Sequence, residues 1–393
     1  MKKILSLDIK YSSIQMIYYA AWAAMMGYAS VYLLDKGFSN SVIGTTLSII
    51  CLLGVILQPM AGTFADKHKH IELRKMIVII MILAIICSLS LYLLKESSLL
   101  LLILFIGVLS FNYAIVPLLN SMAFVFEKYN IKINFGLARG CGSGAYAISS
   151  ILLGYLIEDV GASVLPLIYM IFNIMLIIVT YSFVVPRKDR NKIIIEAEEE
   201  SHGELTLKEF TMKYKRFVIF IIGTVFVYFS MSFLNNFFIQ VITPIGGSES
   251  DMGIAVFIAA MLELPTMALF NTLQAKFGCN TLIRISTVAF IIKAIVTMLA
   301  PNMMWIYFAQ IFQIPSFAFL TPASIYYANI IVNEADLTKG QSLITMGSTG
   351  TGILASLIGG ILLDITSVRN VLLICIIVSS IGAIIVNMVL ENP

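Results

Sequence analysis

The sequence has few charged residues, and this scarcity excludes most soluble folds. Only 12% of its residues are Asp, Glu, Lys or Arg, about half the share in an average globular domain. With 59% of its residues hydrophobic and a mean hydropathy of +0.95, the chain is predicted to be an integral membrane protein. Its pI near 8.4 reflects orientation in the membrane and gives no case for binding nucleic acid.

Signatures of metal, nucleotide and catalytic sites are also missing. The five cysteines lie within or beside apolar segments without metal-ligand spacing, so they are predicted to be small hydrophobic side chains. His68 and His70 stand two residues apart in a polar loop, which fits a plain loop pair better than a metal site. No phosphate-binding loop and no catalytic triad is visible. We therefore expect a protein that is not an enzyme, holds no metal or other cofactor, and does not use bound ATP.

Long apolar runs are what the sequence has in abundance. A helix that crosses a bilayer needs about 20 apolar residues, and the sequence contains twelve such runs. The predicted fold is therefore all-α, with twelve transmembrane helices. They cover residues 11–34, 40–63, 75–95, 98–125, 134–157, 163–185, 216–243, 251–274, 280–300, 303–331, 341–363 and 369–390.

Lys and Arg are distributed unevenly among the segments that join these helices. With the N-terminus in the cytoplasm, the cytoplasmic segments hold twenty of them, and the outer loops hold only Lys36, Lys95 and Arg369. This positive-inside bias predicts a multi-pass protein of the cell membrane with both termini in the cytoplasm.

A single long polar segment, residues 186–215, divides the predicted helices into six and six. We therefore predict a six-helix bundle at 1–185, a cytoplasmic linker at 186–215, and a second six-helix bundle at 216–393. The acidic run Glu196–Glu200 within the linker is expected to be solvated, with a regulatory contact as the alternative.

The two predicted bundles repeat each other weakly in sequence. An offset of 206 residues places Gly144–Gly154 on Gly350–Gly360, and an offset of 209 places Gly62–Lys67 on Asn271–Lys276. Internal repeats are typical of transporters that bind substrate between two related halves. The repeat predicts two pseudo-symmetric bundles with a substrate site at their interface.

Three charged residues lie at least five residues from either end of a predicted helix. Arg139 precedes a run rich in glycine and serine, while Glu263 and Lys293 lie near the middle of their helices. A charge in the hydrocarbon costs roughly 2.5 kcal/mol or more, so such residues are typical of a wet cavity or a charge pair. A purely structural Glu263–Lys293 pair is the alternative for those two. Hydropathy puts Arg139 in the cytoplasmic third of its helix, so a central role requires that helix to begin several residues before Asn134.

The loop after the second predicted helix reads Gly62-Thr-Phe-Ala-Asp66-Lys67 and continues to Arg74-Lys75. It resembles the loop signature of the major facilitator superfamily, which has a glycine, an acid four residues later and then a basic pair. The sequence departs from that signature by two extra residues before Arg74 and by lacking the glycine usually placed there. The resemblance implies a conformational latch formed by these residues, in which Asp66 accepts hydrogen bonds from a helix N-terminus.

The segment from Asn134 to Tyr146 narrows the resemblance. It is similar to the fifth-helix motif of the lactose permease type of oligosaccharide:proton symporters and of related permeases. By position, Arg139 falls on an arginine that binds sugar hydroxyls, Tyr146 on a tryptophan that stacks on the sugar ring, and Glu263 on a sugar-binding glutamate. The chemistry fits these roles, since a guanidinium donates to hydroxyls, a carboxylate accepts from them, and an aromatic face covers C–H groups.

Other positions depart from that family's pattern. Asn120 stands where an acid would face the arginine, and Gln310 and Gln313 stand where a histidine and a glutamate serve proton coupling. Asn235 lies near the place of two further acids that have no counterpart here. Amides do not carry a proton at physiological pH. Either Glu263 alone couples transport to protons, or the protein is a facilitator, or another gradient drives it.

The sequence as a whole favours a secondary transporter of a small polar solute, a sugar or glycoside, that works by alternating access and proton symport. A multidrug or amphiphile exporter of the same fold and an uncoupled facilitator are the alternatives. We expect a monomer whose partners are the solute, the lipid bilayer and protons, with coupling assigned to Glu263 and Lys293. For Trp22, packing is the alternative to lining the cavity. The predicted substrate-binding residues are Arg139, Glu263, Asn120, Tyr146, Trp22, Asn235, Gln310 and Gln313.

Overall fold

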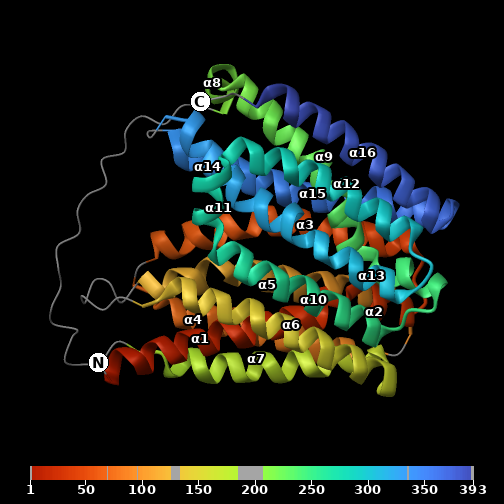
Figure 1. Ribbon diagram of the computed structural model, residues 1–393. Helices are drawn as coiled ribbons and strands as arrows, with labels where there is room; N and C mark the ends of the chain where they lie inside the picture. Colours follow the sequence, from red (N-terminus) through yellow and green to blue (C-terminus); the bar gives the residue numbers. More distant parts are fainter. Residues whose placement is uncertain are drawn as a thin grey trace. The chain divides into compact units, whose positions relative to one another are not determined.

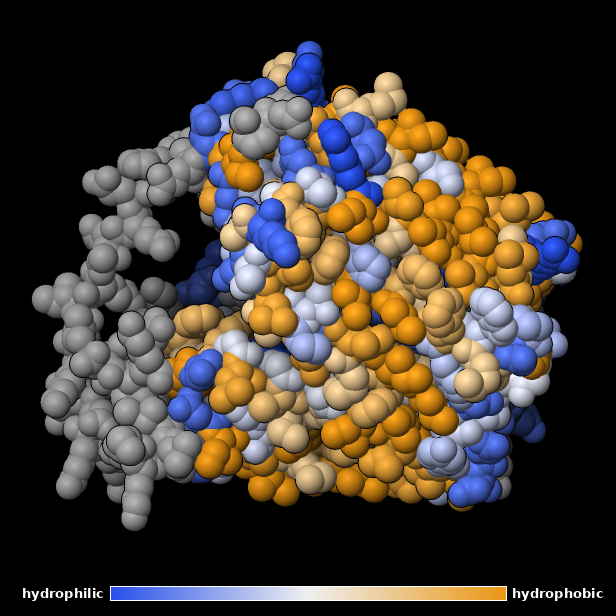
Figure 2. Space-filling view, viewed as in Figure 1, coloured by the Kyte–Doolittle hydropathy of each residue, from blue (hydrophilic) through white to orange (hydrophobic). Residues whose placement is uncertain are grey.

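The computed structural model describes residues 2–68, 70–94, 96–124, 133–184, 207–333 and 336–390. Over these ranges the chain is helical and contains no strand (Figure 1). Eleven helices are long and apolar enough to cross a membrane, or twelve if a first, bent pair counts as one span. Figure 2 shows that hydrophobic side chains gather over the middle of the helices on the visible face, while hydrophilic ones gather near helix ends. This pattern is typical of a surface that faces lipid.

Internal contacts divide the chain into two units. Unit 1 comprises Met1–Phe38 and Leu52–Glu198, and unit 2 comprises Ser39–Cys51 and Glu199–Pro393. Most of the predicted linker lies outside the described residues, so the linker and its acidic run stay predictions. The assignment of residues 39–51 to unit 2 was not expected from the sequence.

Unit 1 is built around two helices, the first helix and α4, which each pack against two others. The first helix packs against α6 and α7, and α4 packs against α5 and α7 (Figure 1). The first predicted span is broken, because a π-helical segment follows α1 and the next piece is bent away by 44°. The helices of unit 1 are α1 (Lys2–Trp22), η1 (Ala23–Gly27), α2 (Ala29–Asp35), the second part of α3 (Asn40–Lys67), α4 (Leu73–Leu93), α5 (Leu99–Phe124), α6 (Phe135–Val160), η3 (Ala162–Val164) and α7 (Leu165–Ser182).

Unit 2 is organised around its first long helix, α9, which lies against α15 and α16 (Figure 1). A Cβ on Gly382 of α16 would lie 2.6 Å from the Val227 nitrogen of α9, so this crossing requires a glycine. The helices of unit 2 are α8 (Leu207–Lys213), α9 (Lys215–Ile242), η5 (Thr243–Ile245), α10 (Glu249–Ala268), α11 (Phe270–Phe277), α12 (Cys279–Leu299), α13 (Met303–Ala309), η6 (Gln310–Gln313), η7 (Ile314–Ala318), α14 (Phe319–Ile331), α15 (Leu337–Ile365) and α16 (Val368–Val389), with the start of α3.

The start of α3 belongs to unit 2 because its first turn is bound to the end of α15. The Asp364 carboxylate accepts hydrogen bonds from the backbone nitrogens of Asn40 at 3.0 Å and Ser41 at 2.7 Å. A carboxylate is well placed there, since a helix N-terminus carries unpaired N–H groups and positive potential. A Cβ on Gly360 would lie 2.9 Å from the Gly44 Cα atom, so the two backbones touch.

The predicted helix 303–331 is interrupted in the structure. A 3-10 segment, η6, and a π-helical segment, η7, replace the regular helix between α13 and α14. Pro315 lies within η7 and has no N–H to donate to the preceding turn. Irregular helical segments inside a span often occur at functional sites, and this one carries two of the predicted site residues.

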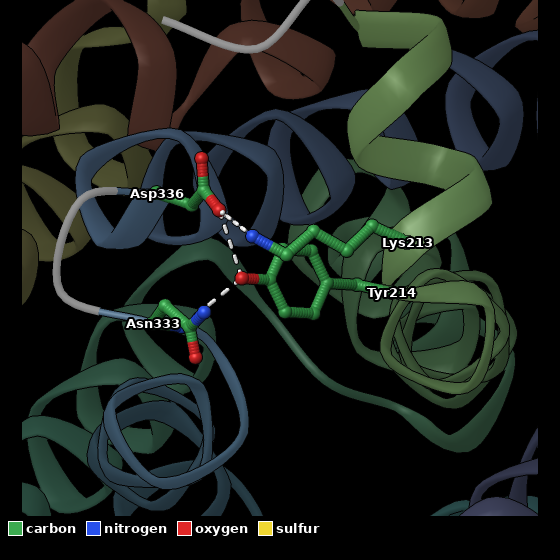
Figure 3. A network of polar contacts seen from close by, with 4 residues as sticks. All are labelled: Lys213, Tyr214, Asn333 and Asp336. Carbon is green, nitrogen blue, oxygen red and sulfur yellow. Dashed lines mark hydrogen bonds and ion pairs between the residues drawn. The ribbon is translucent and has the colours of Figure 1, made fainter. Parts of the chain in front are cut away.

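A polar network fastens the beginning of α9 to the turn before α15 (Figure 3). The Lys213 ammonium and the Tyr214 hydroxyl both donate to Oδ2 of Asp336 at 2.8 Å, and the Asn333 nitrogen donates to the Tyr214 hydroxyl at 3.2 Å. The hydrogen bond between Lys213 and Asp336 raises the pKa of Lys213 and lowers the pKa of Asp336. This network ties the end of α8 and the start of α9 to the turn before α15.

Candidate functional site

Unit 2 contains a chain of three polar side chains from three different elements. The Lys293 ammonium of α12 donates to Oε1 of Gln313 in η6, and Nε2 of Gln313 donates to Oε1 of Glu263 in α10. Lys293 is 8% exposed and Gln313 is 3% exposed. We call Glu263, Gln313 and Lys293 the polar chain.

The partners of Gln313 dictate how its amide is oriented. An ammonium can only donate hydrogen bonds and an ionised carboxylate can only accept them. The amide oxygen must therefore face Lys293 and the amide nitrogen must face Glu263, as observed. The polar chain thus joins a cation to an anion through a neutral group, and its charges balance within unit 2.

The polar chain lies deep within the spans of unit 2. Glu263 falls midway along residues 249–277, the stretch covered by α10 and α11. Lys293 lies 14 residues after Cys279, the first residue of α12, or about 21 Å along the helix. A carboxylate at such depth is costly unless it is paired and hydrogen-bonded, and the polar chain provides both conditions.

In unit 1, Arg139 rests on an aromatic ring. Its Cζ atom lies 4.2 Å from the centroid of the Tyr19 ring in α1, and Nη1 donates to the Ser143 hydroxyl at 2.9 Å. Arg139 forms no ion pair with any carboxylate of the described residues. The guanidinium is therefore held by a π face and one hydroxyl, and its charge has no partner of opposite sign among the described residues of unit 1.

The depth of Arg139 follows from the register of α1 and α6. These helices run side by side, with the Asn134 nitrogen donating to Asp8 at 2.9 Å and the ring of Tyr19 against Gly142. The first span covers Leu7 to Asp35, and Tyr19 lies two residues, about 3 Å, from its midpoint. A central role for Arg139 was predicted to require a helix that begins several residues before Asn134, and α6 begins at Phe135, so that condition is not met. Arg139 lies four residues after Phe135, and its side chain extends toward the middle of the span, to Tyr19 and Ser143.

Aromatic side chains continue from Tyr19 across unit 1. Tyr19 meets Tyr18 edge to face with ring centroids 5.0 Å apart, and Trp22 meets Tyr113 of α5 in the same way at 4.8 Å. Tyr18 is buried and donates to the Asn112 carbonyl, while Tyr19, Trp22 and Tyr113 are half-buried. Trp22 therefore packs against a neighbour and still exposes part of its ring.

The remaining predicted binding residues are more scattered. Tyr146 is half-buried, and its hydroxyl would lie 3.3 Å from a Cβ on Gly27. Asn120 is half-buried near the end of α5 and Asn235 is exposed on α9. Gln310 in η6 donates to the Ile306 carbonyl of α13, and so lies outside the polar chain.

The latch predicted after the second span is open to solvent. Asp66 and Lys75 are exposed, and a Cβ on Gly62 would meet nothing within 4 Å. Arg74 pairs with the neighbouring Glu72, and its guanidinium lies 5.3 Å from the Tyr181 ring centroid. Whether these residues act as a latch stays a prediction. Within the described ranges, no group of three His, Cys, Asp or Glu side chains could hold a metal ion.

Two features of these sites were missed from the sequence. Tyr19 was overlooked because helical spacing places Tyr18 and Trp22 on one face and leaves Tyr19 out. The register of α1 against α6 cannot be predicted from the sequence of either helix alone. The bridging position of Gln313 was missed because it depends on the interrupted helix around Pro315. The glycines near Arg139 gave a partial signal, since Gly142 contacts Tyr19 closely, whereas a Cβ on Gly140 or Gly144 meets nothing within 4 Å.

The chain is similar to known transporters over most of its length. The profile of the MFS_1 like family matches residues 8–374. A maltose permease of Geobacillus stearothermophilus is 24% identical over 93% of this chain and 90% of its own. The uncharacterized transporter YwbF of Bacillus subtilis is 23% identical over 90% of this chain and 86% of its own.

Solved structures match the fold as well. A mutant of the nucleoside transporter NupG superposes with a TM-score of 0.84 at 16% identity, covering 98% of this chain and 100% of that one. A bacterial homolog of the human lysosomal transporter Spinster gives a TM-score of 0.65 at 14% identity, covering 98% and 96%. These matches confirm the predicted all-helical fold.

Proposed function

The chain belongs to the MFS_1 like family and is a major facilitator transporter, and from this premise we propose that it moves a sugar or glycoside by alternating access, coupled to protons. The named relatives support this class of cargo. Maltose is a disaccharide and a nucleoside is a glycoside of a base, so both carry a hydroxyl-bearing sugar ring. A site for such a ring requires hydrogen-bond donors, acceptors and an apolar face.

The observation that carries the proposal is the polar chain. Among the membrane spans of the described residues, Glu263 is the only acid more than two residues from either end of its span, and it is joined to Lys293 through Gln313. A carboxylate can bind and release a proton, and it can accept hydrogen bonds from sugar hydroxyls. We therefore assign both coupling and recognition to this one half-buried carboxylate.

We assign complementary roles to the two units. In unit 1, Arg139 donates to the cargo, and Tyr146 and Trp22 cover its C–H surface. In unit 2, Glu263 accepts from cargo hydroxyls and exchanges the proton, while Lys293 offsets its charge. The amides Asn120, Asn235, Gln310 and Gln313 are proposed as further hydrogen-bond partners of the cargo. The outer and inner sides are reached alternately, as in transporters built from two related halves.

The test is uptake into liposomes that contain the purified protein. Radiolabelled maltose and uridine are offered separately, with and without an inward proton gradient. We expect one of them to accumulate above its external concentration only when the gradient is present. Glu263→Gln is expected to abolish accumulation while leaving exchange of cargo across the membrane, and Glu249→Gln, in the first turn of the same helix, serves as the matched control.

Two results would contradict the proposal in different ways. Uptake that equilibrates but never exceeds the external concentration, whatever the gradient, indicates an uncoupled facilitator. Efflux of a cationic dye, with no uptake of either sugar-containing probe, indicates a multidrug exporter of the same fold.

A further inference from the structure

We propose that Tyr19 is a specificity-determining residue that presents Arg139 to the cargo. Its ring supports the guanidinium from one side, so that the remaining N–H groups of Arg139 are available to oxygen acceptors of the transported molecule. The inference rests on the proposed function, because it assumes that Arg139 binds the cargo. It adds a residue, and a mechanism of positioning, that the fifth-helix motif alone does not contain.

The contacts of Arg139 leave most of its donors available. A guanidinium has five N–H donors in a planar fork, and in the described structure one of them, on Nη1, is directed to Ser143. The Cζ atom of Arg139 lies 4.2 Å from the Tyr19 centroid, within the range of a cation–π contact. A planar cation that is stacked on a ring loses little freedom when it binds a second group along its edge.

Tyr19 is itself firmly supported. Its ring packs edge to face on Tyr18, which is buried and anchored through its hydroxyl to the Asn112 carbonyl at 3.3 Å. On the other side Tyr19 approaches α6 at Gly142, where a Cβ would lie 2.6 Å from its Cδ2 atom. An alanine at position 142 must therefore displace the ring from beneath Arg139.

The chemistry of the site points to oxygen acceptors on the cargo. Within the ranges of unit 1 that the structure describes, Arg139 has no carboxylate partner, whereas the charges of Glu263 and Lys293 are joined through Gln313 in unit 2. An unpaired fork in a low-dielectric span favours a group that accepts two parallel hydrogen bonds. Adjacent sugar hydroxyls and a sugar carboxylate both meet that requirement, and the experiment separates them.

The experiment compares four variants in the liposome assay, with maltose and uridine as probes and glucuronate as a competitor. Tyr19→Leu removes the ring and is expected to weaken half-saturation by about tenfold, between the values typical of exposed and of desolvated cation–π contacts. Tyr19→Phe keeps the ring and is expected to recover most of that loss. Gly142→Ala should resemble Tyr19→Leu, and Gly144→Ala, where a Cβ meets open space, should behave as the parent protein.

Competition then identifies the acceptor. Glucuronate that competes more strongly than glucose in the parent protein, with the difference lost in Tyr19→Leu, indicates a carboxylate; equal competition indicates hydroxyls. Equal half-saturation in the Phe and Leu variants would overturn the proposal, and so would a Gly142→Ala protein indistinguishable from Gly144→Ala.

A measurement without cargo keeps the inference testable if neither probe is transported, a result that would contradict the proposed function alone. Phenylglyoxal modifies free guanidinium groups, and its reaction with Arg139 can be followed by peptide mass spectrometry relative to the exposed Arg284. Tyr19→Leu is expected to raise the Arg139 rate several-fold over Tyr19→Phe. Equal rates in the two variants would show that the ring does not hold Arg139.

Discussion

The two candidate sites differ in how their charged side chains are paired. In unit 2, Glu263 and Lys293 are linked through Gln313, so the polar chain satisfies its own charges. In unit 1, Arg139 is supported by a ring and a hydroxyl but has no anionic partner in the described part of the unit. The polar chain, whose hydrogen bonds are satisfied without cargo, is suited to exchange a proton at its carboxylate. The guanidinium of Arg139, which has unused N–H donors, is suited to select cargo.

This contrast assigns different measurable properties to the two units. Substitutions in the polar chain are expected to change how transport depends on the proton gradient. Substitutions around Arg139 are expected to change affinity and selectivity at any gradient. The first two predictions below test that division and the last two concern residues outside both sites; they run from the largest expected effect to the smallest.

The first prediction concerns the polar chain as a coupling element. Removing one member of a buried, hydrogen-bonded charge pair is costly, and Glu263→Gln is expected to reduce gradient-driven accumulation at least about 100-fold. Because the proposed role needs a titratable carboxylate, combining it with Lys293→Met should leave accumulation equally low. Accumulation restored in the double variant would instead show a structural pair and would remove the contrast between the units.

The second prediction concerns the shape of the cation in unit 1. Arg139→Lys keeps the charge but loses the planar fork, so half-saturation by maltose or uridine is expected to weaken roughly 10- to 50-fold. The ratio of accumulation with and without a proton gradient should stay that of the parent protein when measured at saturating cargo. A change in that ratio would indicate that Arg139 also takes part in coupling.

The third prediction lies outside both sites, at the exposed end of α3. If Asp66 acts as a latch during the conformational cycle, Asp66→Asn should slow the maximal transport rate several-fold and leave half-saturation unchanged. Initial rates across a range of cargo concentrations separate the two parameters. A large loss of affinity at a normal rate would place Asp66 with the binding residues and argue against the latch.

The smallest effect is expected for the network of Lys213 and Asp336. The pKa of Asp336 is lowered on folding, so its stabilisation is present above its unfolded pKa of about 4 and is lost as pH falls through the lower folded value. The pKa of Lys213 is raised, so its stabilisation is present below about 10.4 and is lost as pH rises through the higher folded value.

Lys213→Met should therefore lower the thermal unfolding midpoint slightly at neutral pH and have less effect at either extreme. Lys215→Met, two residues away and exposed, is the matched control. Thermal unfolding in detergent, followed across the pH range, tests this. A difference between the two variants that does not vary with pH would mean that the ion pair does not stabilise the fold.

Hydropathy was sufficient to predict much of the fold. The predicted helix at 134–157 corresponds to α6 at Phe135–Val160, and the one at 98–125 corresponds to α5 at Leu99–Phe124. Long apolar runs predict spans well because a bilayer leaves the backbone few alternatives to the helix. The interruption at η6 and η7 was not predicted, since a proline within a span kinks some helices and is accommodated by others.

The sequence identified the charged residues of the sites but not the side chains that contact them. Arg139, Glu263 and Lys293 stand out in sequence because charge inside an apolar run is rare. Their partners, Tyr19 and Gln313, are ordinary residues whose importance depends on helix register and on a break in a helix. Neither register nor a break can be read from one helix at a time, and for that reason both partners required coordinates.

The fixed direction of the Gln313 amide has a mechanical consequence. When Glu263 takes up a proton, the carboxylate that accepts from Nε2 of Gln313 loses its charge. The hydrogen bond at the amide nitrogen is then weaker, while Lys293 still donates to the amide oxygen. If Glu263 exchanges the proton as proposed, its protonation on α10 changes the hydrogen bonds of Lys293 on α12 through Gln313 in the irregular segment η6. One titratable carboxyl group is thereby linked to three elements of unit 2.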